Sequence, residues 1–311
     1  IITNPPANLP PNFVKSLTEY STYGKWPKPV YAAIKEISYQ GKFALAIPRW
    51  YPTGKLEHYS PLDEIIYDND VMDFGEMKFG CNVQPRDPLQ AETDRYLAGV
   101  DEYSWLQRTS YRVAALETGN GKTSLTIRDI AREGLPTLVT VHKANLLETP
   151  WKKSFAKHTN IPEDKIAFIE GKASLKKILK NISNYVIFVA IIDTINSLIS
   201  SDKELLDEFF RQAKIGIKVC DEAHIKYRFT MNLDMSYDFN KVIYLTATPG
   251  RTSYSAIRLF RYMVPPENYW IGREARQKRD PYLNMAYVFL NSKPSDDWTL
   301  RISRKDGVNL N

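Results

Sequence analysis

The sequence predicts an α/β fold in which a parallel sheet with flanking helices follows a small α+β accessory domain. The prediction rests on a change of pattern along the 311 residues. Residues 1–85 are rich in Pro, Tyr and Trp, and short apolar runs alternate there with turn signals such as Tyr51–Gly54, which is typical of hairpins. From Arg86 onward, apolar strands alternate with amphipathic helices, which indicates strand–helix–strand units.

The second region contains candidate elements of ordinary length. Strands are predicted at Val113–Leu116, Thr137–Val141, Ile166–Ile169, Val186–Ala190, Ile215–Cys220 and Val242–Thr246. Helices are predicted at Lys122–Arg132, Ala144–Lys157, Ser174–Ile182 and Lys203–Ala213. We therefore expect an accessory domain at residues 1–85, a parallel-sheet domain at 86–265, and a linker at 266–311 that leads into a further domain.

Composition limits the class of protein. Hydrophobic residues at 43% and charged residues at 25% are ordinary globular values, which excludes a fibrous or disordered chain. The net charge of +6 favours a polyanionic partner.

Cys81 and Cys220 match no metal spacing, which indicates a reducing compartment. The longest apolar run, Tyr185–Ile192, is far shorter than the roughly 20 residues of a membrane-spanning helix, so we expect no membrane partner and a cytoplasmic location.

A glycine-rich segment follows the first predicted strand of the sheet and opens a helix. Such a loop curls so that its N–H groups point at phosphate oxygens, and the helix N-terminus adds partial positive charge. Lys122 would reach the β and γ phosphates of ATP, and the Thr123 hydroxyl would bind Mg²⁺. The alternative is a glycine-rich turn before a helix. The expected nucleotide-binding residues of the loop are Thr118, Gly119, Asn120, Gly121, Lys122, Thr123 and Ser124.

An acidic tetrad, Asp221-Glu222-Ala223-His224, follows another apolar strand. Asp221 would hold Mg²⁺, Glu222 would polarise the attacking water, and His224 would sense the nucleotide. We expect Glu222, Asp221 and Lys122 to be the catalytic residues. The alternative is a solvated acidic loop. The 99 positions from Lys122 to Asp221 (221 − 122) leave room for about three strand–helix units, which favours a single site.

These motifs resemble the RecA-like motor core of superfamily 2 helicases and translocases of the DEAH-box type, over about Arg86 to Arg251. The resemblance implies that Gln90 reads adenine. Val139–Leu147 resembles the segment that holds the nucleic-acid backbone, which implies contacts from Lys143 and Asn145, although His142 replaces the usual proline.

Two further segments extend the resemblance. Thr194 matches a family phosphate contact, with a helix N-cap at Asp193 or Thr194 as the equal alternative. Thr246-Ala247-Thr248-Pro249 resembles the motif that couples hydrolysis to movement. The resemblance therefore implies that His224, Thr246 and Thr248 are coupling residues.

The accessory region followed by this motor looks most like phage UvsW-type branch-migration helicases, with Phe43–Arg49 resembling part of their leading domain. The resemblance implies an ATP- and Mg²⁺-dependent DNA helicase or translocase that acts on branched or forked DNA in recombination, replication or repair, in the host cytoplasm if it is phage-encoded. The nearest alternative is an RNA helicase, with RNA as the partner. The alternative from another class is a non-hydrolysing ATP switch or DNA-binding adaptor.

The second RecA-like domain of such motors supplies arginine fingers, and we expect it to be missing from residues 1–311. Gly272–Arg276 superficially matches a finger motif, but we expect a basic linker there, and Met285–Leu290 would be the first strand of the second domain. Loss of an arginine finger lowers the rate of related phosphoryl-transfer reactions by about 10³- to 10⁵-fold. We therefore expect the chain alone to bind Mg·ATP and to hydrolyse it slowly.

Overall fold

The structure is a computed structural model. It describes residues 11–20, 28–39, 41–48, 74–108, 110–143, 146–247, 254–264, 268–271, 301–303 and 307–309. The chain divides into two compact units, residues 1–273 and 274–311. In the second unit the structure describes an antiparallel strand pair, β12 (Arg301–Ser303) and β13 (Gly307–Asn309). The predicted segments Gly272–Arg276 and Met285–Leu290 lie outside the described residues.

Seven strands of the described residues form one parallel sheet, in the order β11-β5-β10-β9-β6-β8-β7. The strands are β5 (Tyr111–Ala115), β6 (Thr137–Val141), β7 (Ile166–Ile169), β8 (Ile187–Ile191), β9 (Ile217–Cys220), β10 (Lys241–Thr246) and β11 (Tyr269–Ile271). All six predicted strands are confirmed within two residues at each end. β11 was not predicted because its three residues carry no periodic signal.

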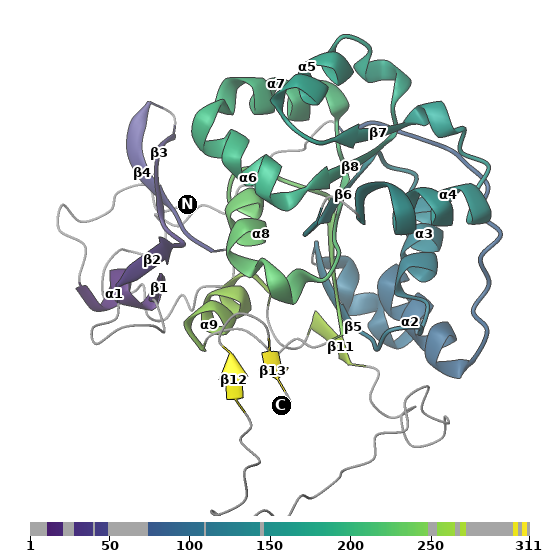
Figure 1. Cartoon of the computed structure of the whole chain (residues 1–311), viewed down its shortest axis with the longest axis horizontal. Helices are drawn as coiled ribbons and strands as arrows, with labels where there is room; N and C mark the ends of the chain where they lie inside the picture. The colour runs from purple at the N-terminus through teal and green to yellow at the C-terminus, as the bar shows by residue number, and fades with distance from the viewer. Residues whose placement is uncertain are drawn as a thin grey trace, which may run out of the picture. The chain divides into compact units, whose positions relative to one another are not determined.

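Helices cover both faces of the sheet (Figure 1). One face packs α2 (Pro88–Ala98), α3 (Lys122–Glu133) and α4 (Lys153–His158). The other packs α5 (Lys172–Leu179), α6 (Ile192–Ser201), α7 (Lys203–Ala213), α8 (Tyr227–Asp234) and α9 (Tyr254–Met263). Successive strand residues point to opposite faces, so Leu138 packs in one core layer and Val139 in the other. This double covering explains why the strands are almost continuously apolar.

The predicted α-helix Ala144–Lys157 is confirmed from Lys153 and wrong in helix type before it, and its first two residues lie outside the described residues. Residues Leu147–Lys152 form one turn of π-helix, η4, and α4 begins only at Lys153. Pro150 lies inside the π-helical turn and has no N–H to donate to the ladder of an α-helix. The apolar pattern alone did not reveal this change of helix type.

The described part of the accessory region consists of short antiparallel pairs, as predicted. α1 (Pro11–Ser16) is followed by β1 (Thr18–Tyr20) paired with β2 (Pro29–Ala32), and by the hairpin β3 (Lys35–Tyr39) and β4 (Lys42–Ala46). The Tyr51–Gly54 turn and Arg49 lie outside the described residues.

The accessory region packs directly on the parallel-sheet region. Phe13 and Leu17 are buried in the core layer that holds α8 and α9. The Arg258 guanidinium of α9 donates to the Thr18 carbonyl at 3.2 Å, and the Lys35 ammonium donates to the Ser236 hydroxyl at 2.6 Å. Both regions belong to the first compact unit, and the domain boundary at residue 85 stays a prediction.

A fully buried ion pair joins β9 to α8. The Lys218 ammonium pairs with the Asp234 carboxylate, and both side chains are 0% exposed. The Tyr244 hydroxyl of β10 donates to the same carboxylate. Charged side chains at such positions need a partner, because an isolated buried charge is strongly destabilising.

Among the described residues, no helix combines the length and apolar character that a membrane crossing needs.

Substitution of Lys218 by Met tests the buried ion pair. Because it leaves the Asp234 carboxylate buried without its cation, we expect the free energy of unfolding to fall by about 3–5 kcal/mol in urea denaturation. The double variant Lys218→Met/Asp234→Leu removes both charges and should recover most of that loss. A loss below about 1 kcal/mol in the single variant would show that the pair is not needed for stability.

Candidate nucleotide site

The predicted phosphate loop joins β5 to α3 at the carboxyl edge of the sheet. Gly119 and Gly121 have φ values of +86° and +81°, in the left-handed region that favours glycine. Gly121 is the N-cap of α3 and supplies no side-chain acceptor to the first turn. The N–H groups of that turn are therefore available to an anion, as a phosphate site requires.

The loop is tied to the neighbouring strand and to its own lysine. The N–H of Leu116 donates to the Thr246 carbonyl at 2.9 Å, which fixes the start of the loop to the end of β10. The Lys122 ammonium donates to the Leu116 carbonyl at 2.8 Å, so it folds back over the loop. Burial lowers the pKa of Lys122, and the Glu222 and Asp221 carboxylates oppose that shift. The charges of Glu222 and Asp221 therefore act on the Lys122 ammonium.

Gln90 lies against the loop. Its side chain amide donates to the Asn120 carbonyl at 3.2 Å and accepts from the Arg86 N–H at 3.0 Å. The N–H of Gln90 donates to Asp87, the N-cap of α2. Gln90 is only 3% exposed, and a Cβ added to Gly121 would lie 2.8 Å from its amide nitrogen. Gln90 thus braces the loop, and a side chain at Gly121 would have to displace the Gln90 amide from its hydrogen bonds.

The acidic box begins directly after β9. The N–H of Asp221 donates to the Thr140 carbonyl at 2.9 Å, which fixes the backbone to β6. One carboxylate oxygen of Asp221 accepts from the Trp151 indole N–H at 3.0 Å. Burial raises the pKa of Asp221 and the Trp151 hydrogen bond opposes that rise, while the Glu222 charge adds to it. Glu222 has φ +49°, a left-handed conformation uncommon for a residue with a side chain.

His224 links the acidic box to the end of β10. Its Nδ1 lies 2.8 Å from the Thr246 hydroxyl and 3.4 Å from a Glu222 carboxylate oxygen. The structure therefore brings together three residues with predicted catalytic or coupling roles, Glu222, His224 and Thr246. Thr248, the remaining predicted coupling residue, lies outside the described residues.

The donor set fits Mg²⁺ held jointly with phosphates. The described residues contain no group of three or more His, Cys, Asp and Glu side chains able to hold a metal alone. Thr123, in the first turn of α3, and Asp221 offer a hydroxyl and a carboxylate oxygen. Mg²⁺ prefers such hard oxygen ligands and usually takes only one or two from the protein, with phosphate and water completing the shell.

Other predicted residues have different surroundings. The Ser124 hydroxyl lies 3.4 Å from the His158 ring, so it faces α4. Thr118 and Gly119 are exposed at the tip of the loop.

Two of the three predicted nucleic-acid residues, Lys143 and Thr194, are described, and each follows the end of a strand. Lys143 is exposed just past β6, and Asn145 lies outside the described residues. The Thr194 hydroxyl donates to the Glu170 carbonyl at 3.3 Å. The alternative of an N-cap at Asp193 or Thr194 is wrong, because α6 starts at Ile192 and the cap position is Ile191.

Sequence reasoning missed Trp151. The indole N–H of a buried tryptophan usually finds an acceptor, but the position of Trp151, 70 residues before Asp221, gives no indication of which acceptor it meets.

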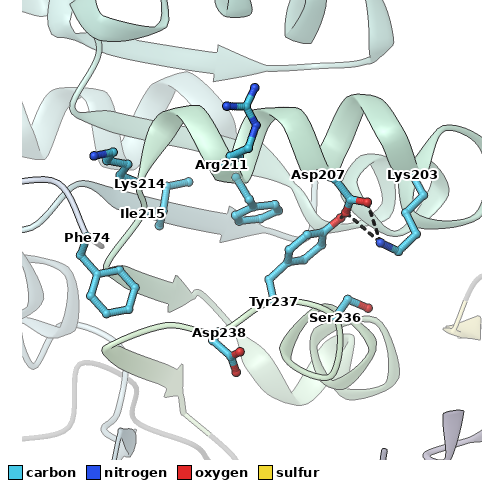
Figure 2. A pocket seen from close by; sticks show the side chains of 10 residues that line it. Phe74, Lys203, Asp207, Arg211, Lys214, Ile215, Ser236, Tyr237 and Asp238 are labelled. Atoms are coloured by element: carbon cyan, nitrogen blue, oxygen red, sulfur yellow. Dashed lines mark hydrogen bonds and ion pairs between the residues drawn. The ribbon is translucent and has the colours of Figure 1, made fainter. Parts of the chain in front are cut away.

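A pocket of about 660 Å³ lies elsewhere in the fold, and none of the predicted site residues line it (Figure 2). Its walls come from α7 and from residues just before β9 and β10, at the amino ends of these strands. In Figure 2 the Asp207 carboxylate faces both the Tyr237 hydroxyl and the Lys203 ammonium, with which it is hydrogen-bonded. Open parallel sheets bind ligands outside the carboxyl ends of their strands, whereas this pocket lies at the amino ends, so it is separate from the candidate nucleotide site.

Alanine at Gly121 and alanine at Gly119 should differ in their effect on stability. Each substitution places a side chain at positive φ, which costs about 1–2 kcal/mol. The added Cβ has nothing within 4 Å at Gly119, whereas at Gly121 it meets the Gln90 amide. We expect Gly121→Ala to lower the free energy of unfolding by about 1–3 kcal/mol more than Gly119→Ala in urea denaturation. Equal losses would show that Gln90 yields freely and does not brace the loop.

Comparison with known proteins identifies the family. No curated protein sequence matches the chain. Among solved structures, the Hef helicase domain of Pyrococcus furiosus is 22% identical, with 52% of this chain and 35% of that chain covered and a TM-score of 0.39. A hypothetical ATP-dependent RNA helicase from Sulfolobus tokodaii is 18% identical, with 60% and 52% covered and a TM-score of 0.41. The chain thus spans about a third to a half of the length of these two structures. The family described as type III restriction enzyme, res subunit, matches residues 84–251, more than half of the 311 residues, and the chain belongs to this family.

Proposed function

We propose that the chain carries the ATP-hydrolysing domain of a helicase or translocase that acts on branched or forked DNA. The observation that carries the proposal is that the phosphate loop and the acidic box meet at Thr246, at the end of β10. The Leu116 N–H donates to the Thr246 carbonyl, and His224 contacts both the Thr246 hydroxyl and the Glu222 carboxylate. Membership of the family supports an ATP-dependent enzyme that acts on nucleic acid. The choice of branched DNA comes from the resemblance of the motifs and of the accessory region to UvsW-type helicases.

Each group at the site has a role in the proposed hydrolysis. The N–H groups of the loop and of the first turn of α3 bind the phosphates, and the Lys122 ammonium turns from the Leu116 carbonyl to the β and γ phosphates. Thr123 and Asp221 hold Mg²⁺, which neutralises phosphate charge when it is bound. Glu222 accepts a proton from the attacking water.

His224 and Thr246 link Glu222 to the end of β10. The ring of His224 contacts both the Glu222 carboxylate and the Thr246 hydroxyl, so a change in Glu222 reaches the end of β10. In the proposal these residues and Thr248 couple the state of the nucleotide to movement.

Adenine recognition by Gln90 stays a proposal. Both ends of its side chain amide are hydrogen-bonded to backbone groups, so a direct contact with the base requires one of these bonds to open. The bracing contacts favour a role of Gln90 in shaping the phosphate loop.

Nucleic-acid contacts are proposed at Lys143, Asn145 and Thr194. Lys143 and Thr194 follow the carboxyl ends of β6 and β8. Exposed Lys143 and the net charge of +6 suit phosphates, which position a strand without reading its sequence. A second RecA-like domain is the proposed partner for full activity.

Substitution of Glu222 by Gln tests the catalytic assignment. Because the amide cannot take a proton from water, we expect single-turnover ATP hydrolysis to slow by about 10²- to 10⁴-fold while ATP binding is retained. Glu204→Gln, at an exposed position of α7, is the matched control and should change neither quantity. Unchanged hydrolysis in Glu222→Gln would remove Glu222 from the mechanism. Absence of any hydrolysis by the intact protein with nucleic acid present, while ATP binding is retained, would favour the non-hydrolysing ATP switch.

Comparison of nucleic acids tests the proposed substrate. For the intact protein we expect forked DNA to stimulate ATP hydrolysis more than linear duplex DNA or RNA of equal length at the same salt concentration. Salt must be fixed because phosphate contacts dominate affinity and weaken as salt rises. Stronger stimulation by RNA would identify the protein as an RNA helicase.

A further inference from the structure

Trp151 is hydrogen-bonded to Asp221, the first carboxylate of the acidic box. Its side chain is 0% exposed, and its indole N–H donates to the Oδ2 atom of Asp221 at 3.0 Å. A buried indole N–H must find an acceptor, and most buried polar groups find one in the backbone or in water. Here the acceptor is a carboxylate of the candidate site, and a hydrogen bond to a charged group is shorter and stronger than a neutral one.

The tryptophan ring is held in place by its neighbours. It comes from the π-helical turn η4, and short π-helical segments are frequent at functional sites. Phe155 lies against the ring, with 6.1 Å between ring centroids. The next residue, Lys152, pairs with the Glu163 carboxylate and lies over the Phe168 ring. The indole N–H is therefore a fixed donor.

The carboxylate is held at its backbone as well. The Asp221 N–H donates to the Thr140 carbonyl of β6, and the side chain is then held at one oxygen by Trp151. Two fixed points, one on each side of Cα, limit rotation of the carboxylate. A carboxylate restrained in this way loses little freedom when it binds a cation, which is how outer-shell hydrogen bonds raise metal affinity.

We propose that Trp151 is a positioning residue for Mg²⁺: its indole N–H holds one oxygen of Asp221 so that the carboxylate faces the metal bound with the nucleotide. This inference rests on the proposed function, because it takes Asp221 as the metal-binding carboxylate. Loss of comparable outer-shell partners typically lowers metal affinity or activity by about 10- to 100-fold.

The test measures equilibrium binding of a fluorescent ATP analogue to the 311-residue chain, in Mg²⁺ and in EDTA. Trp151→Phe keeps an aromatic ring and removes the N–H. We expect the Mg²⁺ concentration for half-maximal tightening of nucleotide binding to rise by about 10- to 100-fold, with binding in EDTA unchanged. A purely structural role would weaken binding equally in both conditions.

Two further variants separate the hydrogen bond from packing. Phe155→Leu disturbs the same buried cluster without touching Asp221, and should leave the Mg²⁺ dependence unchanged. Benzothienyl-alanine at position 151 keeps the shape of the indole and replaces its N–H by sulfur, so it isolates the hydrogen bond even if Trp151→Phe folds poorly. It should reproduce the shift in Mg²⁺ dependence.

The outcomes distinguish this inference from the proposed function. If the unsubstituted chain binds the nucleotide more tightly in Mg²⁺ and the benzothienyl-alanine protein has the same Mg²⁺ dependence, the role of Trp151 is overturned while the nucleotide site stands. The role of Trp151 is likewise overturned if Phe155→Leu shifts the Mg²⁺ dependence as much as Trp151→Phe. If the unsubstituted chain does not bind the nucleotide, or binds it no better than Lys122→Ala, the proposed function fails and the inference fails with it.

Discussion

The parallel register of β5, β10 and β9 is the constraint on which the candidate site depends. β10 pairs with β5 as far as Thr246 opposite Ala115, and with β9 as far as Tyr244 opposite Cys220. Because the strands are parallel, the phosphate loop, the acidic box and the end of β10 all emerge at one edge of the sheet. The contacts of Lys122 and His224 follow from this alignment. A shift of register would separate groups that lie about a hundred residues apart in the chain.

The sequence predicted those parts of the molecule that short-range patterns encode. Buried parallel strands are apolar on both faces, so all six predicted strands were recognisable as apolar runs between helices. The phosphate loop and the acidic box were recognisable because each follows such a strand with a fixed order of residue types. The family match to residues 84–251 confirms the helicase-type domain that these motifs predicted, and the finer UvsW-type assignment is part of the proposed function.

Contacts between distant segments could not be predicted. Lys218 interrupts an apolar strand, and only the fold shows that Asp234 of α8 neutralises it. In the sequence Trp151 has the pattern of an ordinary core residue, and its hydrogen bond to Asp221 depends on how η4 packs beside β7 and β8. The contact that braces the loop at Gly121 likewise joins distant residues. Gln90, in α2, donates to the Asn120 carbonyl, 30 positions later in the chain (120 − 90). Local periodicity carries no information about such pairs, whereas burial makes each of them energetically necessary.

We propose that the loop after β5 and the acidic box after β9 form one site for Mg²⁺ and a nucleotide. The most direct test is a crystal structure of the protein with Mn²⁺ and a non-hydrolysable ATP analogue, in which anomalous scattering locates the metal. We expect phosphates on the N–H groups from Gly119 to Lys122, and Mn²⁺ between the Thr123 hydroxyl and the Asp221 carboxylate. Phosphates bound elsewhere, or a metal that contacts neither residue, would contradict it.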